Sequence, residues 1–169
     1  MSVPSITQTS QYLTFILDEE VFALDISKVR EVLDFTTVAR VPRTPEFMLG
    51  VINLRGSVVP VVDMRIKFGM TGSERSVNTC IIIVEIEIDG ESTILGALVD
   101  SVQEVMDLDP DQIEPPPRIG TRLDIRFIKG MGKRESEFII ILDIDEVFSV
   151  EELASVGNIG EEPLQAAAG

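Results

Sequence analysis

The sequence predicts a mainly β protein built from two similar lobes, and two observations lead to this prediction. The apolar residues gather into short runs of strand length, and the longest purely apolar runs are Val58–Val62 and Phe138–Leu142. A set of spaced residues also recurs along the chain, which is the signature of an internal duplication. With 169 residues, of which 44% are hydrophobic, the chain is large enough to bury a core.

The first half of the chain reads as two hairpins joined by a helical turn. Tyr12–Leu17 and Val21–Ile26 are apolar runs separated by three acidic residues, which predicts a hairpin. Thr44–Gly50 predicts a short helix, with threonine as the N-cap, proline in the first turn and Gly50 as the left-handed stop. Val51–Leu54 and Val58–Val62 predict a second hairpin that turns through arginine, glycine and serine.

The second half continues in the same style. Apolar residues alternate with acidic ones from Ile82 to Asp89, which predicts a strand with one wet face. Phe138–Leu142 predicts a buried strand, and Ser149–Glu152 carries a capping-box pattern that predicts a short helix. The remaining tail is acidic, and we expect it to be flexible.

The repeat is defined by residues that recur at constant offsets. Four residues of the first half recur 80 positions later, the pairs being Phe47 and Phe127, Gly50 and Gly130, Asp63 and Asp143, and Phe68 and Phe148. Val29–Leu33 matches Val102–Met106 at an offset of 73. One insertion between Met106 and Phe127 accounts for both offsets, so we interpret the pattern as a duplication. Asp63 and Asp143 are each expected to cap a short helix.

The duplication predicts the domain organisation. We expect a flexible N-terminus at residues 1–10 and one domain at residues 11–150 made of two intertwined lobes, approximately 11–75 and 76–150. A short helix and an acidic flexible tail should occupy residues 151–169. A lobe with about five short strands suits a small closed barrel, because closure removes sheet edges. Two barrels packed together would leave a groove that can bind a partner.

Composition argues against several classes of function. The chain has no histidine, the side chain most used for acid–base catalysis and metal binding, so we expect no enzyme and no cofactor or metal. The net charge of −15 repels nucleic acid. The apolar runs are far shorter than the ~20 residues that a membrane-spanning helix needs, and the N-terminus lacks a signal-peptide pattern, so we expect a cytoplasmic protein. The single cysteine, Cys80, lies in an apolar run and is expected to be inert.

Local motifs for chemistry are incomplete. Asp107–Asp111 resembles the start of a calcium loop, but Gln112 and Arg118 stand where glycine and glutamate are needed. The glycines near Lys133 do not form a phosphate loop. Asp143 and Asp145 are neighbouring acids, and we attribute the first to helix capping and the second to simple exposure.

The stretch from Gly50 to Arg65 is the most informative segment of the chain. Asn53 and Arg55 precede Gly56 in a hairpin that is otherwise apolar. The planar guanidinium of Arg55 is suited to binding a carboxylate in a bidentate manner. Two interpretations stay open: Arg55 is a buried brace that pairs with an acid of its own lobe, with Glu31 as the first candidate, or it faces a partner, and the two roles can coexist.

At this hairpin the sequence resembles the CheW-like family of chemotaxis coupling proteins. The resemblance rests on Asn53–Gly56 followed by Val58–Asp63, on Val29–Val32, and on Phe127–Gly130 through Ile139–Asp143, and it spans about residues 11–148. It implies two SH3-like five-stranded β-barrel subdomains and no catalytic activity. It also implies an adaptor that joins the cytoplasmic hairpin tip of chemoreceptors to the regulatory domain of the histidine kinase CheA, which shares the fold.

The resemblance also implies where partners bind. The receptor-binding residues carried over by position are Val29, Glu31, Val32, Arg55, Val99 and Val102. The structural motif residues are Gly50, Asn53, Gly56, Asp63, Gly130 and Asp143. No residue is assigned to the kinase interface. The protein would then be cytoplasmic and recruited to membrane-associated receptor arrays, without inserting into the membrane itself.

The main alternative is a barrel that binds a small ligand or nucleic acid. Such a protein needs an aromatic or basic groove. The nine aromatic residues and the strong negative charge make this alternative the weaker one.

Overall fold

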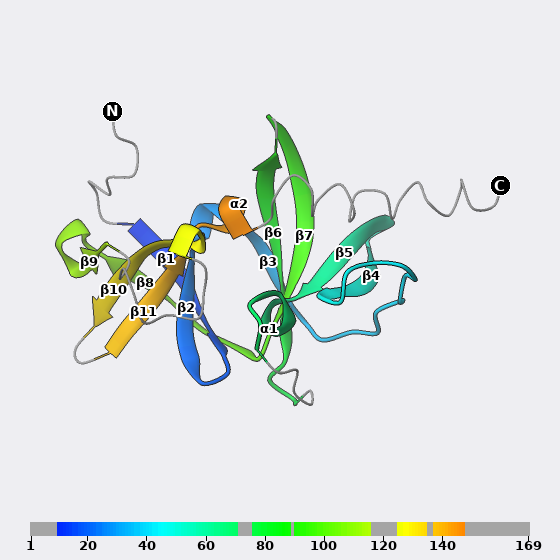
Figure 1. Cartoon of the computed structure of the whole chain (residues 1–169), viewed down its shortest axis with the longest axis horizontal. Helices are drawn as coiled ribbons and strands as arrows, with labels where there is room; N and C mark the ends of the chain where they lie inside the picture. Colours follow the sequence, from blue (N-terminus) through cyan, green and yellow to red (C-terminus); the bar gives the residue numbers. More distant parts are fainter. Residues whose placement is uncertain (1–9, 71–75, 89, 116–124, 135–136, 148–169) are drawn as a thin grey trace.

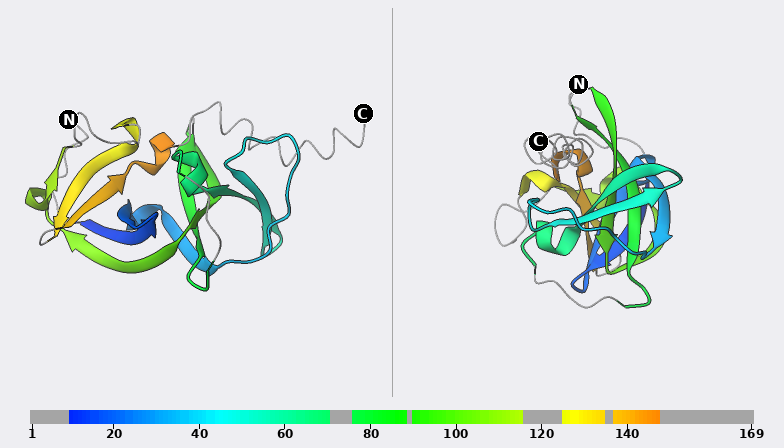
Figure 2. Two further views of the ribbon diagram at one scale, coloured as in Figure 1. Left: turned by 60° about the horizontal axis from the view of Figure 1, so that its bottom comes forward. Right: turned by 90° about the vertical axis from the view of Figure 1, so that its right-hand side faces the viewer.

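The computed structural model describes residues 10–70, 76–88, 90–115, 125–134 and 137–147 of the chain (Figure 1). These residues form two sheets that lie next to each other, with short helical turns at their junction (Figures 1 and 2). The predicted helix at Ser149–Glu152, the flexible tail, Phe148 and the first nine residues lie outside the described residues. The fold is mainly β, as predicted.

Lobe A is the six-stranded sheet with the strand order β8-β1-β2-β11-β10-β9. Its strands are β1 Ser10–Leu17, β2 Glu20–Asp25, β8 Ser101–Leu108, β9 Ile113–Glu114, β10 Ile128–Arg134 and β11 Glu137–Leu142. Lobe B is the five-stranded sheet with the order β3-β6-β7-β5-β4. Its strands are β3 Val29–Asp34, β4 Met48–Leu54, β5 Ser57–Asp63, β6 Cys80–Ile88 and β7 Glu91–Val99.

Helical turns connect these strands. They are η1 Ile26–Lys28, α1 Met64–Lys67, η2 Pro110–Gln112, η3 Ile125–Phe127 and α2 Ile144–Val147. The backbone ladders describe two open sheets in this part of the chain, so closure of each lobe into a barrel stays a prediction. In lobe B the two edges are nevertheless linked, because Ala39, which follows β3 along the chain, forms an antiparallel bridge with Val51 of β4.

The lobes do not divide the chain at residue 75, and the expected halves 11–75 and 76–150 are wrong as structural units. The β1–β2 hairpin of the first half pairs with β8 and β11 of the second half. The β6–β7 hairpin of the second half pairs with β3 and β5 of the first half. Each half therefore gives its first hairpin to the lobe of the other half. The two halves are intertwined through this exchange, and neither half can complete a sheet without the other.

The duplication itself is confirmed by the register of the strands. A bulge separates Met48 from Gly50 in the β4–β5 ladder, and the same bulge separates Ile128 from Gly130 in the β10–β11 ladder. β5 then runs parallel to β7, and β11 runs parallel to β2. The helices α1 and α2 follow at the same offset of 80 residues. The two lobes thus share a topology as well as a sequence pattern.

The predicted helix at Thr44–Gly50 is wrong. Residues 42–47 form turns, and β4 already begins at Met48. Proline and glycine also suit a tight turn followed by a bulge, which is why the local pattern was ambiguous. Gly50 has a φ of +153° inside the strand, and a Cβ there would lie 2.7 Å from Val38 Cγ1. Its role is to let the crossing segment around Ala39 approach the bulge closely.

Three apolar cores explain why some strands lack alternation. Ile81 and Ile83 of β6 pack into a core private to lobe B, whereas Ile82, Val84 and Ile86 pack into a core shared by both lobes. A strand that is buried on both faces reads as a continuous apolar run. Lobe A has its own smaller core, which contains Tyr12. The shared core is built from both sheets, so the junction of the lobes is an apolar interior.

A row of aromatic rings crosses this shared core. Phe15 and Phe22 of lobe A stack with their centroids 5.8 Å apart. Phe68, which follows α1 of lobe B, lies 6.1 Å from Phe22 and 6.1 Å from Phe127 of lobe A. The ammonium of Lys67 sits 5.2 Å above the ring of Phe127. Phe68 is therefore a lobe B side chain embedded between two lobe A rings.

The apolar runs that predicted β5 and β11 are buried only in part. Val58 is 63% exposed and Phe138 is 56% exposed, although the residues that follow them, Val59 and Ile139, are buried. The first residues of these strands extend past the edge of the core, so the expectation of a fully buried Phe138–Leu142 strand is wrong at its first position.

Candidate functional site

The predicted partner-facing segment of lobe B lies on β3, the edge strand of its sheet. Side chains along β3 alternate between half-buried and exposed. Val29 and Glu31 belong to the half-buried set, and Val29 packs against the shared core. Val32 points outward and is 41% exposed, which is unusual for a valine on a strand. An edge strand with an outward apolar side chain is open to pairing with a partner.

Arg55 and Glu31 form a bidentate ion pair. Both guanidinium Nη atoms of Arg55 donate to the carboxylate of Glu31, and the Nη1–Oε1 distance is 3.4 Å. The hydrogen bond to Glu31 raises the pKa of Arg55. This contact confirms that Arg55 pairs with Glu31 of its own lobe. The expectation that the brace is buried is wrong, because the Arg55 side chain is 69% exposed and its guanidinium also faces solvent.

The turn that carries Arg55 is fixed by its neighbours. Arg55 and Gly56 have φ values of +50° and +89°, which is the signature of a two-residue hairpin turn with both central residues left-handed. The side-chain oxygen of Asn53 accepts a hydrogen bond of 2.8 Å from the Gly56 backbone N–H. Asn53 and Gly56 therefore present Arg55 at the tip of the hairpin, toward β3.

A second ion pair lies on the outward face of the same edge. Arg30 of β3 donates to Glu85 of β6 at 2.5 Å. A hydrogen bond from Ser92 and the contact with Arg30 together lower the pKa of Glu85. The exposed face of β3 therefore presents the apolar side chain of Val32 two residues after the ion-paired Arg30, whereas the Arg55–Glu31 pair lies on the other face of the strand.

Val99 and Val102, the two receptor-binding residues predicted in the second half of the chain, have different environments. Val99 is only 1% exposed and lies in the shared core, so its side chain cannot touch a partner and we remove it from the candidate surface. Val102 lies on β8, the edge strand of lobe A, and is half-buried against the shared core. It pairs across its ladder as Val29 does in lobe B, with Phe15 and Val84 as the respective partners. The described contacts join Glu31 and Arg55, whereas Val29 and Val32 share only the strand β3 with Glu31, and Val102 lies on the other sheet.

The remaining motif residues shape the backbone. The Asp63 carboxylate accepts from the Arg65 backbone N–H at 3.0 Å and caps α1, as predicted. Asp143 precedes α2 in the same way, and its backbone carbonyl accepts from Glu146 and Val147. Gly130 leaves room for Ile113, whose Cγ2 would lie 2.7 Å from an added Cβ.

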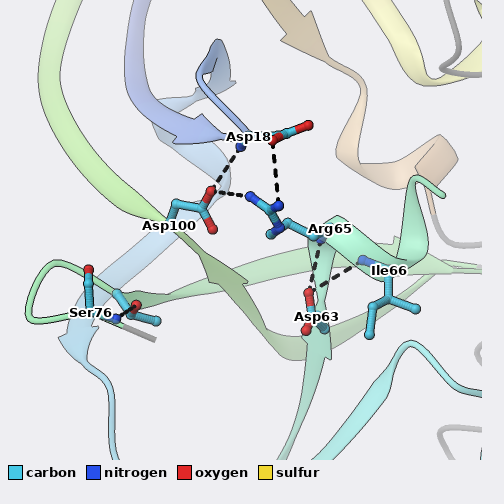
Figure 3. Close-up of polar contacts among 7 residues, drawn as sticks. Asp18, Asp63, Arg65, Ile66, Ser76 and Asp100 are labelled. Carbon is cyan, nitrogen blue, oxygen red and sulfur yellow. Dashed lines mark hydrogen bonds and ion pairs between the residues drawn. The ribbon is translucent and has the colours of Figure 1, made fainter. Parts of the chain in front are cut away.

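Sequence reasoning missed a set of charged residues at the junction of the lobes. Arg65, Asp100 and Asp18 form one cluster there (Figure 3), and Lys28 and Asp145 form another. The expectation that Asp145 is simply exposed is wrong, because it accepts two hydrogen bonds. A charged residue at the second position of each repeated helix, Arg65 and Asp145, was the signal that could have revealed them.

Potential metal ligands are scattered among the described residues. Among them, no three histidine, cysteine or acidic side chains converge to hold a metal ion. Cys80 is half-buried, and desolvation raises the pKa of its thiol, which makes it a poor nucleophile. Within the same part of the chain, no helix is long and apolar enough to cross a membrane. What the geometry offers instead is a surface for contact with other molecules.

Comparisons with known proteins agree with this description of the site. The family model of the CheW-like domain matches residues 11–152. A chemotaxis protein CheW from Klebsiella aerogenes is 34% identical over 155 residues, which cover 92% of this chain and 91% of that protein. A chemotaxis protein CheW from Rhizobium meliloti is 32% identical over 142 residues, covering 84% of this chain and 89% of the relative.

A solved structure extends the likeness to the fold. The crystal structure of the scaffolding protein TtCheW from Thermoanaerobacter tengcongensis superposes with a TM-score of 0.75 and 39% sequence identity. The match covers 85% of this chain and 94% of that one. The two-sheet fold and the charge-braced edge thus define a β-sheet interaction module. The chain belongs to the CheW-like family.

Proposed function

We propose that this protein is a non-enzymatic adaptor of chemotaxis signalling, which couples chemoreceptors to the histidine kinase CheA. The observation that carries the proposal is the edge strand β3 of lobe B, which presents the exposed Val32 on one face and binds the Arg55 hairpin tip through Glu31 on the other. Membership of the CheW-like family over residues 11–152 supports the adaptor role. The names of relatives, a chemotaxis protein and a scaffolding protein, support it further.

The receptor side of the proposal rests on the chemistry of this edge. The cytoplasmic tip of a chemoreceptor is a helical hairpin, and a helix docks by laying an apolar stripe on a partner surface. Val32 supplies an exposed apolar contact. Val29 on β3 of lobe B and Val102 on β8 of lobe A add half-buried apolar surface. Arg55 keeps donors free toward solvent after binding Glu31, so it can also contact a polar rim residue of the receptor.

The experiment for this surface is a titration of a receptor hairpin fragment against two matched variants. Val32→Asp places a charge in the proposed contact and should weaken binding at least tenfold, because a buried unpaired carboxylate is costly. Val105→Asp is the control, since Val105 is 47% exposed at the equivalent position of lobe A. Equal affinities of Val32→Asp and wild type, with unchanged circular dichroism, would reject this site.

The kinase side rests on two exposed residues at equivalent positions of the repeat. Val58 is the second residue of β5 and Phe138 is the second residue of β11, and both are more than half exposed. Large apolar side chains in such positions are typical of protein contacts. If the kinase's regulatory domain has the same fold, a barrel-to-barrel contact at these strand starts is reasonable, and we infer that the kinase docks there.

A pull-down with the kinase regulatory domain tests this assignment. Val58→Asp and Phe138→Asp should each reduce kinase capture, and the pair together should abolish it. Val77→Asp is the control, because Val77 is 98% exposed in a loop between the two strands β5 and β6. Neither kinase variant should affect the receptor titration. Loss of both partners in one variant would instead indicate misfolding.

The proposed location follows from the partners. We propose that the protein works in the cytoplasm and is recruited to membrane-associated receptor arrays without inserting into the membrane. A fluorescent fusion should cluster where receptors cluster and become diffuse in the Val32→Asp variant.

A further inference from the structure

A charged cluster joins the two lobes at one side of their junction (Figure 3). Arg65, on α1 of lobe B, donates to the Asp100 carboxylate at 2.6 Å and lies 3.5 Å from the Asp18 carboxylate. Asp18 is in the β1–β2 turn of lobe A, and its backbone N–H donates to the same Asp100 oxygen at 2.8 Å. Asp100 itself is the residue between β7 of lobe B and β8 of lobe A. One arginine therefore connects a helix, a crossover and the opposite hairpin.

A second cluster does the same with the other lobe's helix. Asp145, on α2 of lobe A, accepts from the Lys28 ammonium at 2.8 Å. Its other oxygen accepts from the Glu87 backbone N–H of β6 in lobe B at 3.2 Å. Lys28 ends η1, which is the crossover from β2 of lobe A to β3 of lobe B. Here too one side chain connects a helix, a crossover and the opposite hairpin.

The two clusters are copies of each other with the charges reversed. Arg65 and Asp145 occupy the second position of α1 and α2, exactly one repeat offset of 80 residues apart. Each binds a charge on a crossover and a group on the hairpin that the repeat exchanges between lobes. The helix residue is the cation in the first cluster and the anion in the second. Both helices lie at the junction of the lobes (Figures 1 and 2).

We propose that these two charge-reversed clamps set the relative orientation of the lobes. The shared apolar core holds the lobes together, but apolar burial is non-directional and tolerates small rotations at constant area. Charge-assisted hydrogen bonds impose distances and angles. Arg65 is only 13% exposed, so its pairing is less screened than that of a surface ion pair. The two clamps tie different crossovers and different hairpins, so together they fix the rotation of the lobes more tightly than one clamp alone.

The clamps give the adaptor a fixed geometry, a consequence that rests on the proposed function. The receptor surface is assigned to β3 and Arg55 of lobe B with Val102 of lobe A, and the kinase surface is assigned to exposed residues near the strand starts of both lobes. The angle between the lobes then sets how the residues of each surface are placed relative to one another. A variant without clamps keeps every residue of both surfaces, so weaker binding of either partner by that variant would come from the changed angle.

The test measures the distance between the lobes in the full-length protein. Ser57→Cys and Glu137→Cys place spin labels at equivalent exposed strand starts of lobes B and A, in a Cys80→Ser background. Pulsed electron–electron double resonance should give one narrow distance distribution. Combining Arg65→Met with Asp145→Ala should broaden its width at least twofold, and each single variant should shift or broaden it less.

Matched variants separate the clamps from general destabilisation. Arg30→Met combined with Glu85→Ala removes an ion pair of 2.5 Å inside lobe B and should leave the distribution unchanged. Arg65→Lys keeps the positive charge but loses the planar guanidinium that binds both carboxylates. If the double variant does not fold, Arg65→Lys serves in its place and should give a distance distribution broader than that of the wild type. A folded double variant with the wild-type width, or equal broadening in the control pair, overturns the proposal.

The distance measurement needs no partner, so it distinguishes the clamp proposal from the proposed function. If wild-type protein shows the clamp-dependent width but captures neither receptor nor kinase, the proposed function fails and the clamps stand. If both partners bind and the width does not depend on Arg65 and Asp145, the clamps fail alone.

Discussion

Replacement of Phe68 by alanine should strongly destabilise both lobes together. Phe68 is 7% exposed and its ring lies between Phe22 and Phe127, each with a centroid 6.1 Å away. Removing a buried phenylalanine ring loses its transfer free energy and leaves a cavity, which together cost about 3–5 kcal/mol. Because Phe68 lies at the junction of the lobes, the loss of packing should destabilise both lobes. For a chain of this length, such a loss lowers the Tm by about 6–20 °C.

Phe138→Ala is the matched control for this experiment. The same atoms are removed, but Phe138 is 56% exposed, so the cost should stay within about 0.5 kcal/mol. Phe68→Leu should fall between the two, because it keeps part of the buried volume.

The assay is urea unfolding followed by two probes. The chain has no tryptophan and one tyrosine, Tyr12, which lies in the private core of lobe A, so tyrosine fluorescence reports lobe A. Circular dichroism reports both lobes. We expect coincident transitions in wild type and in Phe68→Ala, because the hairpin exchange and the shared core couple the lobes. A loss below about 1 kcal/mol for Phe68→Ala, or two separated transitions in wild type, would refute the shared-core reasoning.

Two further predictions concern the backbone and the lone thiol. Gly50→Ala should destabilise the fold by about 2 kcal/mol or more, because Gly50 has a φ of +153° and the new methyl group would collide with the Ala39 segment. Gly56→Ala is the control and should cost about 1 kcal/mol, because the space around Gly56 is open. Equal losses of stability on thermal melting would contradict the explanation that Gly50 permits a close approach. Cys80 should react with a thiol reagent more slowly than Ser57→Cys across pH 7–9, because desolvation raises its pKa and delays formation of the thiolate. A raised folded-state pKa also means that this thiol's contribution to stability is present at neutral pH and is lost as the pH rises through that pKa, so a Cys80→Ser variant should show a flatter stability profile above pH 8.

The sequence predicted the local pieces of the fold well. The repeat at an offset of 80 residues located β5 and α1 and their copies β11 and α2, because each of these pieces is a local apolar run followed by a capping aspartate. The sequence also paired Arg55 with Glu31, since a guanidinium is suited to binding a carboxylate and Glu31 was the first candidate in its lobe. The nature of the fold was therefore visible before any coordinates.

The non-local features could not be predicted in the same way. The exchange of hairpins between halves changes no residue pattern, because β6 and β7 look the same whichever sheet they join. Val99 was placed on a surface by position from the family resemblance, and only the shared core explains its burial. Asp145 was attributed to simple exposure and Arg65 was given no role, since their partners on the crossovers are 117 and 35 residues away. Contacts at that separation depend on how the lobes are docked.

The central claim is that this protein physically joins a receptor to the kinase. The most direct measurement is co-sedimentation of the kinase with nanodiscs that carry a chemoreceptor, in the presence and absence of the protein. We predict that the kinase sediments only when the protein is added, and that Val32→Asp abolishes this effect while Val105→Asp does not. Kinase sedimentation that is the same with and without the protein would contradict the account.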